Sequence, residues 1–300
     1  MQFARPLAVL VLAVGGCACR SAAIKEVVEG SMDYQSHLET TPARVRVETV
    51  DDYLNRVAAC IMNASRRWED AQALQVEAER KRSRRNGALA TSISSEHIEF
   101  YDEFSVYVVH SVAPNAATPG DNCAELTTRL FLELECPEEL VAVLCHEFAH
   151  VQLEHQVNQV LRRKQHAVGV GIVAGLGAAA DAYAASLNPQ HKMQDWDGMY
   201  QEAVSAYKPW DKRDEFAADS RGLDYYLELG LDPAKYVLVF ELLSRWGDDE
   251  SETHPRISDR IQRINDRLAE LHGHEVDVDE QLSPLLASGV LEGASAIARV

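Results

Sequence analysis

Basic side chains are scarce in this sequence. Its 300 residues include 29 lysines and arginines but 47 aspartates and glutamates, so the formal net charge is −18. A surface this acidic disfavours a nucleic-acid partner, because phosphate binding requires a basic surface. The one basic cluster, Lys81-Arg82-Ser83-Arg84-Arg85, follows a helical pattern. Such a cluster is more typical of a solvated helix end than of a contact with anionic lipid headgroups.

Internal repeats, low-complexity tracts and convincing transmembrane segments are also missing. Residues 167–185 are rich in glycine and alanine, which contribute little transfer free energy, and Asp181 interrupts them. We therefore predict a tightly packed helix or a helical hairpin there. Because 46% of the residues are hydrophobic, the chain is expected to form one packed domain with tails.

Residues 1–16 have the features of a targeting segment. Arg5 precedes an apolar run, Leu7 to Val14, that is too short to span a bilayer stably. The following Val14-Gly15-Gly16-Cys17 resembles the lipobox of bacterial lipoproteins. This resemblance implies that residues 1–16 are a signal peptide and that Cys17 is acylated. Because Ala18 carries no inner-membrane retention signal, it also implies that the protein is anchored in the outer membrane and faces the periplasm. The alternative is an ordinary signal peptide and a soluble periplasmic protein.

An oxidising periplasm would permit disulfides among the remaining cysteines. These are Cys19, Cys60, Cys123, Cys136 and Cys145. Cys145 adjoins a histidine in an apolar helical pattern and is expected to be a small buried residue. Cys123 and Cys136 flank a loop, so a bridge between them is a hypothesis, although pairing cannot be read from sequence.

Hydrophobic periodicity divides the rest of the chain. Residues 17–43 are polar and without sustained period, as in a tether. A helix is predicted from Val50 to about Arg85, a strand at Phe104–Val109 and a second strand near Ala124–Thr128. Further helices are predicted from Pro137 onward and at Asp214–Leu229, Pro233–Trp246 and Ile257–Leu271.

The stretch His146-Glu147-Phe148-Ala149-His150 carries the strongest chemical signal. Helical spacing places His146 and His150 one turn apart on one face, where two imidazoles can share a Zn²⁺ ion. Glu147 is displaced around the helix toward the metal-bound water, as a general base must be. A catalytic zinc still needs a third protein ligand and an open fourth position.

A second motif, Asp214-Glu215-Phe216-Ala217-Ala218-Asp219, supplies what the first lacks. Glu215 can be the third ligand, so one zinc ion per chain is predicted. Asp219, one turn later, can accept the free ring N–H of a zinc histidine and set its tautomer. Burying two histidines and three carboxylates without a cation would cost several kcal/mol.

The combined motifs resemble zinc metallopeptidases of the HtpX and CAAX-prenyl-protease type, in the gluzincin group. The resemblance runs from Asn115 to about Arg260 and includes Asn115-Ala116-Ala117-Thr118-Pro119-Gly120, although Asp121 stands where a second glycine is usual. It implies a zincin-like, mostly helical α+β domain over residues 44–272, with a small sheet and an active-site helix. Residues 273–300 would form an acidic tail.

The resemblance also implies further site residues. An edge strand at Asn122–Thr127 would bind an extended peptide by β-augmentation through Asn122, Cys123, Ala124 and Glu125, although Glu125 departs from the usual apolar residue. His254 would approach the metal, either to stabilise an oxyanion or to hold the enzyme latent. Arg256 is a second candidate for that role. His155 is expected to be structural, because helical geometry turns it from the zinc face.

The implied activity is ATP-independent endopeptidase cleavage of misfolded or misassembled envelope proteins. A rival of another class is a lipoprotein scaffold or chaperone with a latent or structural zinc site. Glu147 argues against that rival, because a structural zinc does not use a general base. Processing of prenylated proteins within the membrane is disfavoured by the lack of convincing transmembrane helices.

Overall fold

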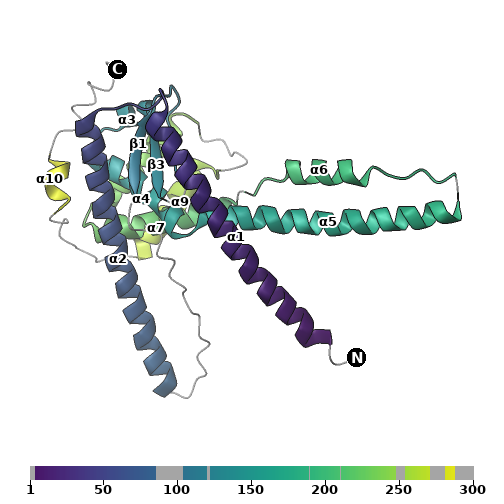
Figure 1. The fold of residues 1–300 in the computed structure, drawn as a ribbon. Coiled ribbons are helices and arrows are strands. Elements are labelled where there is room, and N and C mark those ends of the chain that lie inside the picture. Colours follow the sequence, from purple (N-terminus) through teal and green to yellow (C-terminus); the bar gives the residue numbers. More distant parts are fainter. Residues whose placement is uncertain are drawn as a thin grey trace. The chain divides into compact units, whose positions relative to one another are not determined.

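The computed structural model describes residues 4–85, 104–119, 122–188, 190–209, 211–247, 254–270 and 281–287. They fall into two compact units. The larger unit combines Gly30–Glu154 with Lys212–Val300, and the smaller unit combines Met1–Glu29 with His155–Asp211. The described residues are mostly helical and include one small mixed sheet, as predicted (Figure 1).

The sheet of the larger unit has the strand order β1-β3-β2. β1 (Ser105–Val109) pairs in parallel with β3 (Cys123–Thr127), and β2 (Ala116–Ala117) pairs antiparallel with β3. The prediction that Asn122–Thr127 forms an edge strand is therefore wrong. β3 is buried on both faces, as a central strand must be, and the short β2 forms an edge instead.

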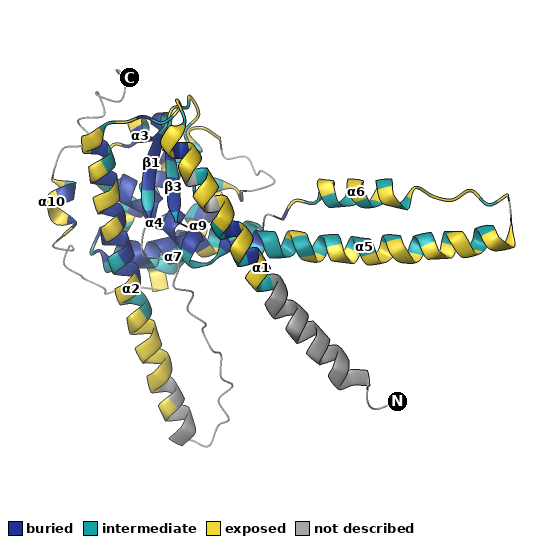
Figure 2. Ribbon diagram, in the orientation of Figure 1, coloured by how far each residue is buried: buried dark blue, intermediate teal, exposed yellow. Residues whose placement is uncertain are grey.

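The centre of the larger unit is α4 (Pro137–Gln152), which starts with proline in its first turn and carries Glu138 and Glu139 near its positive dipole end. Most of its residues are buried (Figure 2). α7 (Lys212–Glu228) packs against it. The two helices approach closely at Gly222, where an added Cβ would lie 3.0 Å from both the Cα and the backbone nitrogen of His146.

Other helices enclose this pair. They are α2 (Glu48–Arg85), α3 (Thr128–Glu133), α8 (Pro233–Ser244) and α9 (Ile257–Glu270). α2 begins and ends close to its predicted bounds, and only its first half is buried in the core. Part of the predicted acidic tail also packs: α10 (Ser283–Leu286) follows the buried Leu282 and brings Leu285 into the core.

The proposed bridge between Cys123 and Cys136 does not form. Cys136 is a free cysteine at the N-cap position of α4, where its side chain makes no capping hydrogen bond, whereas Cys123 is fully buried beside Leu38 and Tyr107. Cys145 is fully buried in α4, as expected, and burial raises its thiol pKa well above the usual range.

The smaller unit contains a helical hairpin of α5 (His155–Leu187) and α6 (Trp196–Ala206). α1 (Ala4–Thr40) supplies Ala23 and Val27, which pack on Val157 of α5. The predicted tether is thus largely helical. Residues 167–185 lie in α5, but the prediction of tight packing is wrong for one face. α5 is long and apolar enough to cross a membrane, and its apolar window is not buried.

Candidate metal centre

Three side chains from two helices converge in the larger unit. His146 and His150 lie one turn apart on α4, and Glu215 lies in the first turn of α7. The Nε2 atoms of the two histidines are 3.1 Å apart. Glu215 places Oε2 3.7 Å from His146 Nε2 and Oε1 3.6 Å from His150 Nε2. The three residues can therefore offer their ligand atoms to one ion.

This geometry fits a tetrahedral metal. Two nitrogens, each about 2.0–2.1 Å from a zinc ion, would lie about 3.3 Å apart, close to the observed separation. Among the described residues, the buried acids of this site outnumber the bases: Glu215 and Asp219 pair with the guanidinium of Arg260, and the carboxyl group of Glu147 lies beside them. A divalent cation would offset this excess of acidic groups, so the donor set suits a metal both in geometry and in charge.

Asp219 contacts the ring of His146. Its Oδ1 is 2.9 Å from Nδ1 of His146, so that ring carries its proton on Nδ1 and presents the lone pair of Nε2 to the metal position. Arg260 of α9 donates to the same carboxylate through Nε (2.8 Å) and Nη2 (2.6 Å). The guanidinium also lies 3.5 Å from Oε2 of Glu215.

These contacts decide the charge states of the buried acids. Burial alone would raise the pKa of the Asp219 carboxyl, but Arg260 and His146 lower it below its usual range. Burial likewise opposes ionisation of Glu215, yet His254, His146, His150 and Arg260 hold its pKa well below the usual range. Both carboxyls are thus ionised at neutral pH.

Glu147 has a different environment from the other two carboxyls. Burial raises its pKa, although the nearby His146 partly offsets this effect. The hydroxyl of Thr118, the residue after β2, lies 2.8 Å from its Oε2 and donates a hydrogen bond to it. A carboxylate with a raised pKa and a fixed orientation is suited to accept and return a proton.

Comparison with protein families tests the expectation that these motifs raised. Residues 77–268 match the model described as peptidase family M48, which is more than half of the chain. The chain belongs to peptidase family M48. No curated protein matches it. The matched residues of this M48 peptidase include every side chain of the candidate metal centre, and the family is one of metal-dependent peptidases.

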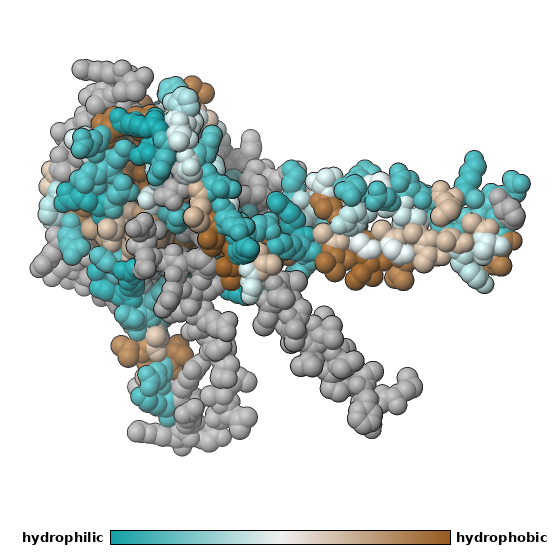
Figure 3. Space-filling view, in the orientation of Figure 1, coloured by the Kyte–Doolittle hydropathy of each residue, from teal (hydrophilic) through white to brown (hydrophobic). Residues whose placement is uncertain are grey.

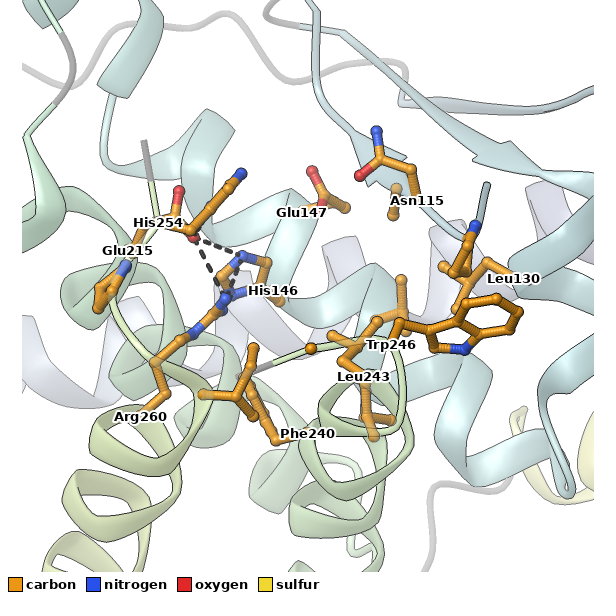
Figure 4. A pocket seen from close by; sticks show the side chains of 18 residues that line it. Asn115, Leu130, His146, Glu147, Glu215, Phe240, Leu243, Trp246, His254 and Arg260 are labelled. Carbon is orange, nitrogen blue, oxygen red and sulfur yellow. Dashed lines mark hydrogen bonds and ion pairs between the residues drawn. The ribbon is translucent and has the colours of Figure 1, made fainter. Parts of the chain in front are cut away.

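A cavity of about 300 Å³ adjoins the metal centre of this M48 chain (Figure 4). His146, Glu147, Glu215 and His254 line it at one side. The remaining lining is mainly apolar and includes Leu130, Val143, Phe240, Leu243 and Trp246. The site therefore combines polar groups beside the metal position with a pocket for an apolar side chain.

The structure brings His254 to the site but not Arg256. His254 lines the cavity with Nδ1 3.2 Å from Oε2 of Glu215, and its side chain is 53% exposed. Arg256 is exposed, whereas Arg260, one helical turn later, reaches the buried acids. Sequence reasoning missed Arg260 and Thr118. The role of Arg260 could be predicted only if the approach of α9 to α7 were known, because no pattern near Arg260 marks its partners on α7.

The predicted peptide-binding strand also needs correction. Cys123 and Ala124 are fully buried, and Glu125 accepts a hydrogen bond from Tyr34. None of the residues from Asn122 to Glu125 lines the cavity. The cavity is lined instead by Asn115, which precedes β2, and by Ala116 of β2. Outside the metal centre, His155 is buried at the start of α5, and Cys17 lies in α1. The side chain of Cys17 is outside the described residues.

Proposed function

We propose that this M48 chain is a zinc-dependent endopeptidase in which His146, His150 and Glu215 hold the metal. The observation that carries the proposal is the convergence of two Nε2 atoms and a carboxylate on one point, with a second carboxylate beside them. A structural zinc site closes its coordination with four protein ligands. Here the described residues offer three candidate ligands, and two of them, His146 and Glu215, line a cavity, which is the arrangement of a catalytic site.

The protein side chains have separate roles in the proposed reaction. When bound, zinc supplies a Lewis acid that polarises the scissile carbonyl and acidifies the attacking water. Glu147 accepts the proton from that water and passes it to the leaving amine. Thr118 orients Glu147, and Asp219 holds His146 in the ligating tautomer. His254 lies on the cavity beside Glu215, where it can donate a hydrogen bond to the developing oxyanion.

The cavity and the sheet edge support an extended polypeptide as substrate. β2 is an edge strand, and Ala116 of this strand lines the cavity, so a peptide that pairs with β2 would pass the metal centre. A large apolar side chain of that peptide would fit between Phe240, Leu243 and Trp246. Unfolded proteins expose both extended backbone and apolar side chains. We therefore propose misfolded or misassembled envelope proteins as the substrate class.

The first experiment combines metal analysis with cleavage of casein, an unfolded protein. Wild type should contain about one zinc per chain and lose activity to a chelator. Glu147→Gln should keep the zinc and lose at least about 100-fold in turnover, because the base is removed without a change of shape. Glu138→Gln is the matched control, since it makes the same substitution on α4 outside the cavity.

Two results would overturn the proposal. Casein cleavage by Glu147→Gln at the wild-type rate would refute the role of the base. Zinc without cleavage in wild type, and also in His254→Ala, would favour a scaffold or chaperone with a structural metal site.

The N-terminal sequence supports a location at the periplasmic face of the outer membrane. We propose that Cys17 is acylated after removal of residues 1–16. Labelled palmitate should enter the wild-type protein and not Cys17→Ser in a bacterial host. Equal labelling of both proteins, or of neither, would contradict acylation at Cys17.

A further inference from the structure

The outward face of α5 in the smaller unit is exposed and apolar. Six large side chains on it are between 59% and 69% exposed: Val168, Ile172, Val173, Leu176, Tyr183 and Leu187. The other exposed positions between residues 168 and 187 are glycine, alanine or serine, and none is charged. Figure 3 shows hydrophobic side chains gathered along α5. The face is about 28 Å long at 1.5 Å per residue.

The opposite face of α5 is occupied by α6 and the loop before it. The backbone of Gly177 lies so close to Trp196 that an added Cβ would meet the indole ring at 2.4 Å. Asp181 accepts hydrogen bonds from the indole Nε1 of Trp196 and the backbone nitrogen of Gln194, both at 2.8 Å, and lies 2.9 Å from His191. The hairpin is therefore held together without the outward face of α5.

The outward face of α6 is polar, unlike that of α5. Its exposed residues are Asp197, Met199, Gln201, Glu202, Ser205 and Ala206. The hairpin thus has one apolar side and one acidic side. This separation is typical of a helical element that lies in the plane of a membrane interface.

We propose that the α5–α6 hairpin lies in the surface of a lipid bilayer, with the outward face of α5 among the acyl chains. A membrane-spanning hairpin would carry Asp197 and Glu202 into hydrocarbon. It would also carry Asp181 into hydrocarbon. Hydrogen bonds from Gln194, His191 and Trp196 lower the pKa of Asp181 to about 2, so this residue is charged. An interfacial position leaves these charges in water and removes only the apolar face from it.

The N-terminal part of the same unit supports a lipid occupant. Ala23 and Val27 of α1 pack on Val157, and Lys164 of α5 lies 2.7 Å from Glu26. Cys17 precedes Ala23 by six residues, a rise of about 9 Å along a helix. A lipid on Cys17 would therefore hold this unit at a membrane. This support rests on the proposed acylation, whereas the exposed face of α5 does not depend on it.

A second copy of the chain is the competing occupant. A protein interface surrounds its apolar centre with a polar rim, which allows the free subunit to stay in water. The exposed face of α5 has no charged residue over 20 positions, so acyl chains match it better. A photo-crosslinking experiment separates the two occupants, because the adduct identifies what covers the face.

The test uses the full chain reconstituted into phosphatidylcholine vesicles, with the photoreactive residue p-benzoylphenylalanine at one position at a time. Positions 172 and 176 lie on the outward face of α5. Their side chains are exposed, so a larger residue there should not disturb folding. Position 201 on the exposed side of α6 is the matched control. Mass spectrometry should find lipid adducts at positions 172 and 176 at least about ten-fold above those at position 201.

Three outcomes would overturn the proposal. Adducts from positions 172 and 176 to a second copy of the chain would assign the face to self-association. Absence of adducts at both positions would leave the face in water. Equal lipid adducts at position 201 would show that the hairpin is immersed in lipid. None of these readouts involves peptide cleavage, so they leave the proposed peptidase activity untouched.

Discussion

Replacement of Arg260 by methionine tests whether the metal centre depends on a buried charge pair. Arg260 is 6% exposed and donates two hydrogen bonds to Asp219, at 2.6 and 2.8 Å. Methionine keeps an apolar stem but also removes the guanidinium from the ring of Phe240, whose centroid lies 4.8 Å from the guanidinium carbon. The variant therefore removes the guanidinium while it leaves a side chain of similar length in the core.

The expected loss of stability is large. Removal of one partner from a buried ion pair leaves the other charge uncompensated and costs about 3–5 kcal/mol. Among the described residues, the carboxylate of Asp219 would then keep its contact with His146 but no cationic partner of its own. We expect the metal-free Arg260→Met protein to lose about 3–5 kcal/mol of unfolding free energy near pH 7. An exposed control on the same segment, Arg256→Met, should change by less than about 0.5 kcal/mol.

The pH dependence gives this prediction a second check. Arg260 contributes to the lowered pKa of Asp219, so the stabilisation is present above the unfolded-state pKa of about 3.9 and is lost as the pH falls through the folded-state value. The difference between wild type and Arg260→Met should therefore shrink below about pH 4.

Urea unfolding in the presence of a chelator measures both effects. A loss below about 1 kcal/mol near pH 7 would refute the argument from burial. A loss of about 3–5 kcal/mol that persists below about pH 4 would show that packing, and not charge, accounts for the loss.

Three further predictions concern catalysis and the cavity. Metal-free Glu147→Gln should be more stable than wild type at neutral pH. Burial raises the folded-state pKa of Glu147, so ionisation of this carboxyl weakens folding as the pH rises through its unfolded-state pKa. A lower unfolding free energy of the variant in urea would contradict this. Thr118→Val should lower kcat about ten-fold with little change in KM, and Thr118→Ser should restore it; unchanged steady-state kinetics of Thr118→Val would show that the hydroxyl is dispensable. Trp246→Ala should lower kcat/KM about ten-fold for peptides with a large apolar residue at the cleavage site, and much less for matched alanine peptides; equal losses would remove Trp246 from substrate selection.

The relative positions of the two candidate histidine ligands could be predicted because helical periodicity is local. The spacing of His146 and His150 places them on one face of α4, and the structure shows their Nε2 atoms together. The same argument correctly paired Glu215 with Asp219 on α7. Their approach to the histidines could be inferred only from chemistry, because no local pattern specifies how two helices pack.

Other features depend on tertiary packing and were missed or predicted wrongly. Arg260 and Thr118 reach the site from segments far away in sequence, so nothing near them marks their partners. β3 was expected at an edge, but strand order is decided by long-range pairing. The prediction for residues 167–185 was wrong about packing because hydropathy measures apolar content and not what covers it.

Because α4 and α7 approach closely at Gly222, the packing of these two helices in the core determines how far apart the candidate metal ligands lie. A methyl group there would lie 2.6 Å from the hydroxyl oxygen of Tyr236 and 3.0 Å from the backbone of His146, so α7 would have to move away from α4. Glu215 belongs to α7 and would move with it. A chain with alanine at position 222 would keep every candidate metal ligand and still displace Glu215 from the two histidines, so a search for intact motifs would miss the change.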